Sequence, residues 1–249
     1  MKTTKLLLAL LVSIGCGVSF AAGGHGHWSY DGKEGPSHWG DLSEEFKTCK
    51  LGKSQSPLNI DTKLVKKTNA GQVKPGYKAS DAELVNNGHT IQVNLVDGGL
   101  ANLGGKDYKI LQFHFHTPSE ETVDGKAYPI NAHLVHKSAD GKLGVVGVFF
   151  KEGKENAALK DIFAALPKSE SKSALKSKFN AADLLPSSVA NYSYTGSLTT
   201  PPCSEEVSFF ILKTPIEMSA SQLSAFKKVF NMNARPVQPL NGRSIQVTE

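Results

Sequence analysis

The chain has 249 residues, of which 39% are hydrophobic and 20% are charged, and its formal net charge is +5. A chain of this length can bury one large core, and mixed or all-β proteins of this size often form a single domain. The basic residues form no concentrated patch, so the composition excludes a nucleic-acid-binding surface. No repeat, low-complexity tract or internal linker divides the sequence.

The first residues have the pattern of an export signal. Lys2 and Lys5 precede an apolar run over residues 6–14, and Ala21 and Ala22 supply the small side chains that a signal peptidase accepts. The apolar run is too short to cross a membrane as a stable helix. We therefore expect a periplasmic or secreted protein, with no membrane anchor once the signal is removed.

The predicted boundaries are a signal peptide over residues 1–21, cleaved at one of the two alanines, and one domain over residues 22–249. Cys16 leaves lipidation open as an alternative to cleavage at the alanines. Ser13 argues against it, because a bulky aliphatic residue usually stands at that distance before a lipidated cysteine.

Two cysteines, Cys49 and Cys203, remain after the signal is removed. Exported compartments permit disulfides, so an even pair predicts one bridge. The region 23–57 is rich in Gly, Pro and aromatic residues and is expected to be an ordered segment that wraps the body of the protein. The aromatic residues expected to pack there are Trp28, Tyr30 and Trp39.

Most of the remaining chain alternates apolar and polar residues, or is β-branched, between Gly, Asn and Asp turns. The predicted strands cover residues 91–95, 108–115, 131–136, 144–150 and 207–212. Helical periodicity is confined to residues 155–166, which end at Pro167, and to residues 219–230, where Ser219 and Gln222 fit a capping box. The predicted fold class is a mixed α/β, β-dominated single domain with short surface helices.

Three histidines carry the strongest chemical signal. His114 and His116 are two residues apart in a predicted strand, so their side chains share one face. If the strand containing His133 pairs beside the first, the three imidazoles form a site of the kind that holds catalytic zinc and leaves its fourth position open to water. Paired strand histidines also occur as ordinary structural residues, so the spacing alone leaves both roles open.

The chain resembles the α-class carbonic anhydrases of the exported bacterial type, over about residues 28–243. The motifs that match are Gln55-Ser56-Pro57, Asn86-Asn87-Gly88-His89, Gln112 to His116, Ser119-Glu120, His133-Leu134-Val135-His136, Ser197 to Pro202, and Asn233 to Leu240. The resemblance implies a large twisted, mostly antiparallel central β-sheet. It also implies reversible hydration of carbon dioxide to bicarbonate and a proton, through hydroxide bound to Zn²⁺.

The resemblance assigns the metal to His114, His116 and His133. It also assigns the groups that hold the other nitrogen of each ring, which are Gln112 for His114, the backbone carbonyl of Asn233 for His116, and Asn131 for His133. Asn131 departs from the glutamate found in many animal members. A neutral amide is a weaker acceptor than a carboxylate, so we expect a lower metal affinity than in those relatives.

The implied catalytic residues are Thr199, Glu120 and His89. An ionised Glu120 would take the hydroxyl hydrogen of Thr199, which leaves the threonine oxygen to accept the proton of hydroxide. His89 stands at the position of the proton shuttle. Thr200 is expected to contact bicarbonate.

The apolar wall for carbon dioxide is expected from Val135, Val145, Leu198 and Phe209, the last replacing a tryptophan common in the family. Tyr30, Asn86 and Gln92 are expected to line the cavity. The resemblance further implies inhibition by sulfonamides and anions, and it leaves both a monomer and a homodimer open.

Two other classes compete with this interpretation. His114, His116 and Glu120 also fit a cupin-like site with two histidines and one carboxylate. Against it, no glycine precedes the first histidine, and Thr199-Thr200-Pro201-Pro202 would have no role. A catalytically silent binding module of the same family is the second alternative, but such modules lose zinc histidines. No H-E-x-x-H motif supports a zincin protease.

Overall fold

The structure is a computed structural model that describes residues 26–249. The predicted signal peptide, its cleavage site and Cys16 lie outside the described residues. Within residues 26–249, no helix has the length and apolar character needed to cross a membrane.

Sixteen strands are present in this range: β1 (Asn59–Ile60), β2 (Lys66–Lys67), β3 (Val73–Tyr77), β4 (Ala82–Asn86), β5 (Ile91–Leu95), β6 (Gly99–Leu103), β7 (Lys106–His116), β8 (Thr122–Val123), β9 (Lys126–Ala127), β10 (Ile130–Ser138), β11 (Leu143–Glu152), β12 (Ser171–Ala174), β13 (Asn191–Ser197), β14 (Glu205–Leu212), β15 (Ile216–Met218) and β16 (Gln246–Thr248). The α-helices are α1 (Trp39–Leu42), α2 (Thr48–Leu51), α3 (Lys160–Ala164) and α4 (Ala220–Lys227). Short 3₁₀ helices are η1 (Gly32–Glu34), η2 (Glu44–Phe46), η3 (Ala157–Leu159) and η4 (Ala181–Leu184).

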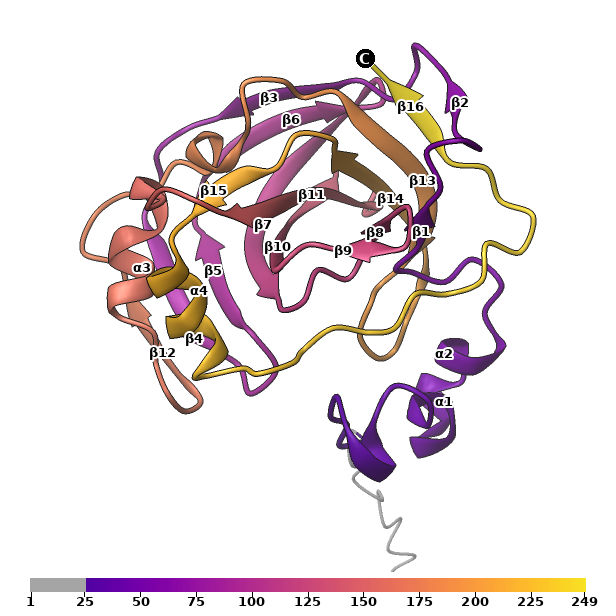
Figure 1. Cartoon of the computed structure of the whole chain (residues 1–249), viewed down its shortest axis with the longest axis horizontal. Helices are drawn as coiled ribbons and strands as arrows, with labels where there is room; N and C mark the ends of the chain where they lie inside the picture. Colours follow the sequence, from indigo (N-terminus) through magenta and orange to yellow (C-terminus); the bar gives the residue numbers. More distant parts are fainter. Residues whose placement is uncertain (1–25) are drawn as a thin grey trace, which may run out of the picture.

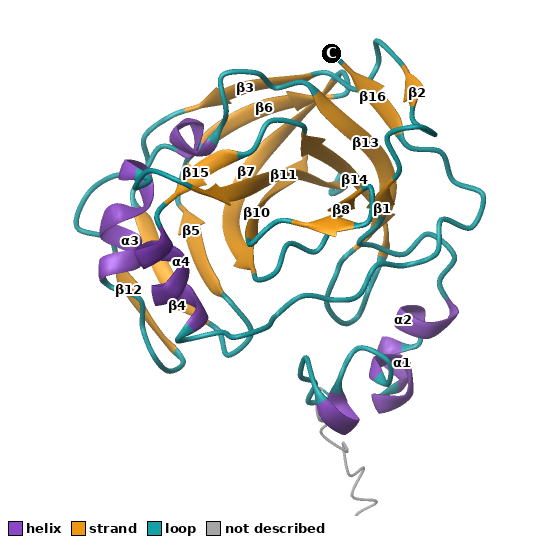
Figure 2. Ribbon diagram, in the orientation of Figure 1, coloured by secondary structure: helices purple, strands orange, loops and turns teal. Residues whose placement is uncertain are grey.

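One large sheet dominates the part of the chain that the structure describes. Thirteen strands belong to it, and its main path runs β12-β4-β5-β7-β10-β11-β14-β13-β16-β2. Its pairs are antiparallel except that β11 runs parallel to β14 and β15, and β16 runs parallel to β2. Figures 1 and 2 show the strands as one strongly curved layer with the short helices at its margins. The predicted large, mostly antiparallel central sheet is confirmed; β1, β8 and β9 form a separate three-stranded sheet.

The predicted strands are confirmed, and most of them are longer than expected. β5 has the expected bounds, whereas β7, β10, β11 and β14 are each two or three residues longer in total than the predicted runs. These extensions follow from backbone pairing with neighbours, which the local hydrophobic pattern does not encode.

The predicted helices are shorter than expected. The region 155–166 contains only η3 and α3, and the Asn156 side chain caps η3 by accepting from the backbone N–H of Leu159. In the second region, α4 begins after Ser219, and the predicted capping box between Ser219 and Gln222 is present. The cap specifies the start of α4 because it satisfies N–H groups that the first turn leaves without partners.

The sheet separates two hydrophobic cores, because alternate residues of a strand point to opposite faces. Phe113 and Phe115 of β7 face the larger core, together with Leu134 of β10. Val145 of β11 and Phe209 of β14 belong to the smaller core on the other face. The residues that alternate with Phe113 and Phe115 are histidines, so these imidazoles lie on the face of the smaller core.

The amino-terminal segment packs as expected around its aromatic residues. Trp39 is fully buried, and its indole N–H donates to the carbonyl of Ser29 at 2.9 Å. Trp28 meets both Trp39 and Tyr30 edge to face. This segment, with α1 and α2, lies beyond one edge of the curved sheet in Figure 1.

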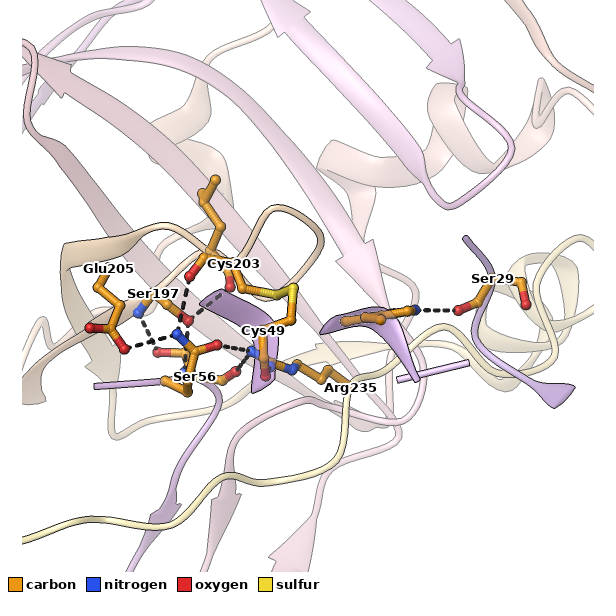
Figure 3. The surroundings of a disulfide bond; sticks show 10 residues. Ser29, Cys49, Ser56, Ser197, Cys203, Glu205 and Arg235 are labelled. Atoms are coloured by element: carbon orange, nitrogen blue, oxygen red, sulfur yellow. Dashed lines mark hydrogen bonds between the residues drawn. A yellow bond between two sulfur atoms is a disulfide. The ribbon is translucent and has the colours of Figure 1, made fainter. Parts of the chain in front are cut away.

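The predicted disulfide is present between Cys49 in α2 and Cys203 in the loop that follows β13. Figure 3 shows it beside the guanidinium of Arg235, which donates to the carbonyl of Cys49 at 3.0 Å. The bridge therefore joins the amino-terminal segment to the loop before β14.

Candidate active site

Three imidazoles meet on one face of the sheet because β7 and β10 are antiparallel neighbours. His133 of β10 lies directly opposite His114 of β7, and His116 is two residues further along β7 on the same face. One nitrogen of each ring lies within 4.8 Å of the others. This spacing matches a set of ligands around one metal ion.

The outer nitrogens of two rings are held as expected. Nδ1 of His114 donates to Oε1 of Gln112 at 2.9 Å, and Nδ1 of His116 donates to the carbonyl of Asn233 at 2.8 Å. These bonds leave Nε2 of both rings free to face the cluster. Nε2 of His116 is buried and has no hydrogen-bond partner within the described residues. A buried polar atom without a partner is costly, and a metal ion would satisfy it.

The third imidazole differs from the expectation. Nε2 of His133 donates to Oε2 of Glu121 at 3.0 Å, so the acceptor is a carboxylate of Glu121. Asn131 turns its amide nitrogen, a donor, toward the same region, with Nδ2 3.0 Å from both Glu121 Oε2 and His133 Nε2. The predicted role of Asn131 as acceptor for His133 is therefore not met. Because a carboxylate is present after all, the neutral Asn131 no longer implies a weakened metal site.

The histidines occupy an environment that disfavours their protonation. Burial and the neighbouring His133 lower the pKa of His114 to about 3, and burial also lowers the pKa of His116. For His133, burial acts to lower the pKa, but the Glu121 and Glu120 carboxylates outweigh it and raise the pKa. His114 and His116 are thus neutral at physiological pH, which is the form that binds a metal.

Glu120 is a buried carboxylate beside two of the three histidines, His116 and His133. Burial raises its pKa to about 7 and Glu121 acts in the same direction, while His133, the backbone N–H of Arg235 and the hydroxyl of Thr199 act to lower it. The Arg235 N–H donates to Oε1 at 2.9 Å. Oε2 lies 3.4 Å from Nε2 of His116 and 3.6 Å from Nδ1 of His133. The effect of the Thr199 hydroxyl on the pKa of Glu120 indicates that these two side chains are close together, as the expected contact requires.

A cavity of about 180 Å³ opens onto the histidines. The predicted apolar residues all line it, as do both threonines and the predicted shuttle histidine: Val135, Val145, Leu198, Phe209, Thr199, Thr200 and His89. Tyr30 and Gln92 also line the cavity, as expected. Asn86 does not, because its amide donates to the carbonyl of Pro167 and its oxygen accepts from the N–H of Gly88. The cavity lining thus combines apolar side chains with polar groups and the half-buried His89.

His89 lies at the mouth of the cavity, and its ring is stacked on Trp28. The ring centroids are 3.7 Å apart and the planes are inclined by 10°. Burial and His27 lower the pKa of His89, whereas Glu170 raises it. The side chain of Asn233 donates to the carbonyl of His89 at 3.0 Å, so one residue supports both His89 and the ligand His116.

A sequence model of the family described as eukaryotic-type carbonic anhydrase matches residues 34–249. The chain belongs to the α-carbonic anhydrase family. A carbonic anhydrase from Neisseria gonorrhoeae is 42% identical over 247 residues, which cover 98% of this chain and 97% of that protein. The predicted family and enzyme class are confirmed.

Solved structures agree with the assignment to the α-carbonic anhydrases. The α-carbonic anhydrase of Thermovibrio ammonificans, in complex with the inhibitor sulfanilamide, is 47% identical, with a TM-score of 0.86 over 90% of this chain and all of that chain. Dioscorin complexed with ascorbate is 31% identical, with a TM-score of 0.84 over 90% of this chain and 98% of that chain. The same fold therefore also occurs in proteins with other names and ligands, so activity has to be argued from the site.

Sequence reasoning missed Glu121 and the contact of Trp28 with His89. Glu121 is the second member of an acidic pair, and only Glu120 matched a family motif. The neutral Asn131 could have indicated it. Without a carboxylate at position 131, His133 needs another acceptor, and Glu121 is an acidic residue close by in the sequence. Nothing local in the sequence indicates the stacking of Trp28 on His89.

Proposed function

We propose that this α-carbonic anhydrase catalyses the zinc-dependent, reversible hydration of carbon dioxide to bicarbonate and a proton. The observation that carries the proposal is the cluster of three imidazoles, each with one nitrogen held by an acceptor and one left toward the centre. A cupin-like site would use Glu120 as a ligand. In this structure a third imidazole, His133, completes the cluster in place of that carboxylate, and the backbone N–H of Arg235 donates to one oxygen of Glu120, which disfavours the alternative.

The donor set fits zinc. Three neutral nitrogen ligands with an open fourth position are typical of catalytic zinc sites, and the outer hydrogen bonds fix each ring in a metal-binding orientation. When bound, zinc lowers the pKa of a coordinated water to about 7 and so supplies a nucleophile at neutral pH, a value established for carbonic anhydrases themselves.

Thr199 and Glu120 orient the reacting oxygen. An ionised Glu120 accepts the Thr199 hydroxyl hydrogen, so the Thr199 oxygen is available only as an acceptor toward the cavity. Thr200 also lines the cavity, and in this proposal its hydroxyl donates to bicarbonate. Carbon dioxide carries no net charge and is suited to the apolar side of the cavity, which is formed by Val135, Val145, Leu198 and Phe209.

His89 carries the proton from the cavity to solvent. It is half-buried at the cavity mouth, and its lowered pKa keeps the ring neutral, and therefore able to accept a proton, near pH 7. We further propose that the enzyme acts in the periplasm or outside the cell, which the disulfide and the signal-like first residues support. Sulfonamides are expected to inhibit it, as sulfanilamide does the Thermovibrio enzyme.

The experiment is to measure metal content and carbon dioxide hydration on the purified mature protein. We expect one zinc per chain, loss of hydration after extraction with a chelator, and recovery when zinc alone is restored. Iron at unit occupancy without hydration would favour the cupin-like alternative. Bound zinc without hydration would favour a silent binding module.

A further inference from the structure

Glu121 is a fully buried carboxylate that no family motif explains. It lies immediately before β8, and its Oε2 accepts from Nε2 of His133 and from Nδ2 of Asn131, both at 3.0 Å. Its Oε1 accepts from the hydroxyl of Tyr194 at 3.1 Å. Three donors therefore satisfy the two oxygens. Burial of a carboxylate is tolerable only with such partners.

The neighbouring Asn131 is arranged to support this carboxylate. Its Nδ2 donates to Glu121, and its Oδ1 faces the backbone N–H of Glu120 at 3.4 Å. The amide therefore has its acceptor side toward the backbone and its donor side toward Glu121. It cannot at the same time accept from His133.

We propose that Glu121 is the positioning residue for the metal ligand His133, and that Asn131 is its neutral partner. Many animal members have a glutamate at the position of Asn131 in β10. In this chain the carboxylate near His133 belongs instead to Glu121, in the segment before β8. This inference rests on the proposed zinc centre. By accepting the Nε2 hydrogen, Glu121 holds His133 in the tautomer whose Nδ1 faces the other two ligands, and its charge makes the imidazole a stronger donor to the metal.

The two side chains form one pair that carries a single negative charge. Asn131 Nδ2 lies as close to His133 Nε2 as Glu121 Oε2 does. An aspartate has the same shape as asparagine, so Asn131→Asp places a carboxylate oxygen about 3.0 Å from His133. When it is combined with Glu121→Gln, the charge returns to one and the bond between the two side chains is kept with its polarity reversed.

The test compares zinc affinity in the natural protein, Glu121→Gln and the double variant Glu121→Gln/Asn131→Asp. Affinity is measured by competition with a chromophoric chelator, which does not depend on catalysis. Glu217→Gln is the matched control, because it removes a partly exposed carboxylate of β15 that contacts Lys151. We expect Glu121→Gln to weaken zinc binding ~10–100-fold, the double variant to recover most of it, and the control to match the natural protein.

Affinity of Glu121→Gln within twofold of the natural protein, or no recovery in the double variant, would overturn the assignment. If Glu121→Gln does not fold, the double variant alone tests the proposal. A zinc affinity of the double variant near that of the natural protein supports it, and weak zinc binding or failure to fold overturns it. A natural protein that binds no zinc would instead refute the metal centre itself, so the two failures are distinguishable. The visible spectrum of cobalt-loaded protein gives a second readout of the geometry around His133.

Discussion

Removal of the disulfide tests how the amino-terminal segment supports the loop that carries Thr199 and Thr200. Cys49 and Cys203 close a loop of 154 residues. The N–H of Cys203 donates to the carbonyl of Thr200 at 2.9 Å, and its carbonyl accepts from the Gln55 side chain at 3.1 Å. Figure 3 shows Arg235 beside the bridge, where its guanidinium donates to the carbonyl of Cys49 and to Oε1 of Gln55. The bridge thus holds the chain three residues after Thr200.

The expected loss in the free energy of unfolding follows from the length of the loop that the disulfide closes. Chain entropy for a loop of this size corresponds to about 5 kcal/mol at 25 °C, and strain in the native state or structure in the unfolded chain reduces that value. We expect Cys49→Ser/Cys203→Ser to lose about 2 to 5 kcal/mol of the free energy of unfolding. For a protein of this size the loss corresponds to a decrease in Tm of roughly 5 to 20 °C.

The assay is thermal unfolding monitored by circular dichroism, with metal content and hydration rate measured on the same samples. Replacing both cysteines leaves no free thiol, and reduction of the natural protein is the independent comparison. We expect Tm to fall clearly, the hydration rate to fall moderately because the Thr199 loop is less restrained, and zinc to stay bound because no ligand lies on that loop. Unchanged melting in the double variant, or loss of zinc together with the bridge, would refute this reasoning.

Other variants test the metal, the shuttle and the inhibitor site. His116→Ala removes one of three ligands, so bound zinc and hydration should be lost together. His89→Ala should lower kcat in weak buffer far more than kcat/KM, with recovery in imidazole; equal losses without recovery would exclude a shuttle. Burial lowers the pKa of His89, so the neutral imidazole that accepts a proton persists to lower pH. Trp28→Ala exposes the His89 ring and should raise its pKa, which moves the acid limb of the kcat–pH profile to higher pH. An unchanged acid limb would contradict this reasoning. Sulfanilamide should inhibit the zinc enzyme and bind Thr199→Ala more weakly, whereas equal affinity would argue against that contact.

Several features of the site could be predicted from the sequence because they depend on local backbone geometry. The two-residue period of a strand places His114 and His116 on one face whatever the strand pairs with. The capping box at Ser219 and Gln222 is also local, since both partners lie within one turn of α4. Motifs in the family's order, by resemblance, added the fold, which is confirmed, and the metal ligands and shuttle position, which remain proposals.

Only the tertiary structure decided which groups meet across the chain. The register between β7 and β10 brings His133 opposite His114, and a shift of one residue would turn His133 to the other face. The contact of Glu121 with His133 joins a residue before β8 to one in β10, and the stack of Trp28 on His89 joins two segments about sixty residues apart. Local propensity carries no information about such contacts, because their free energy comes from packing and hydrogen bonds that exist only after the sheet has formed.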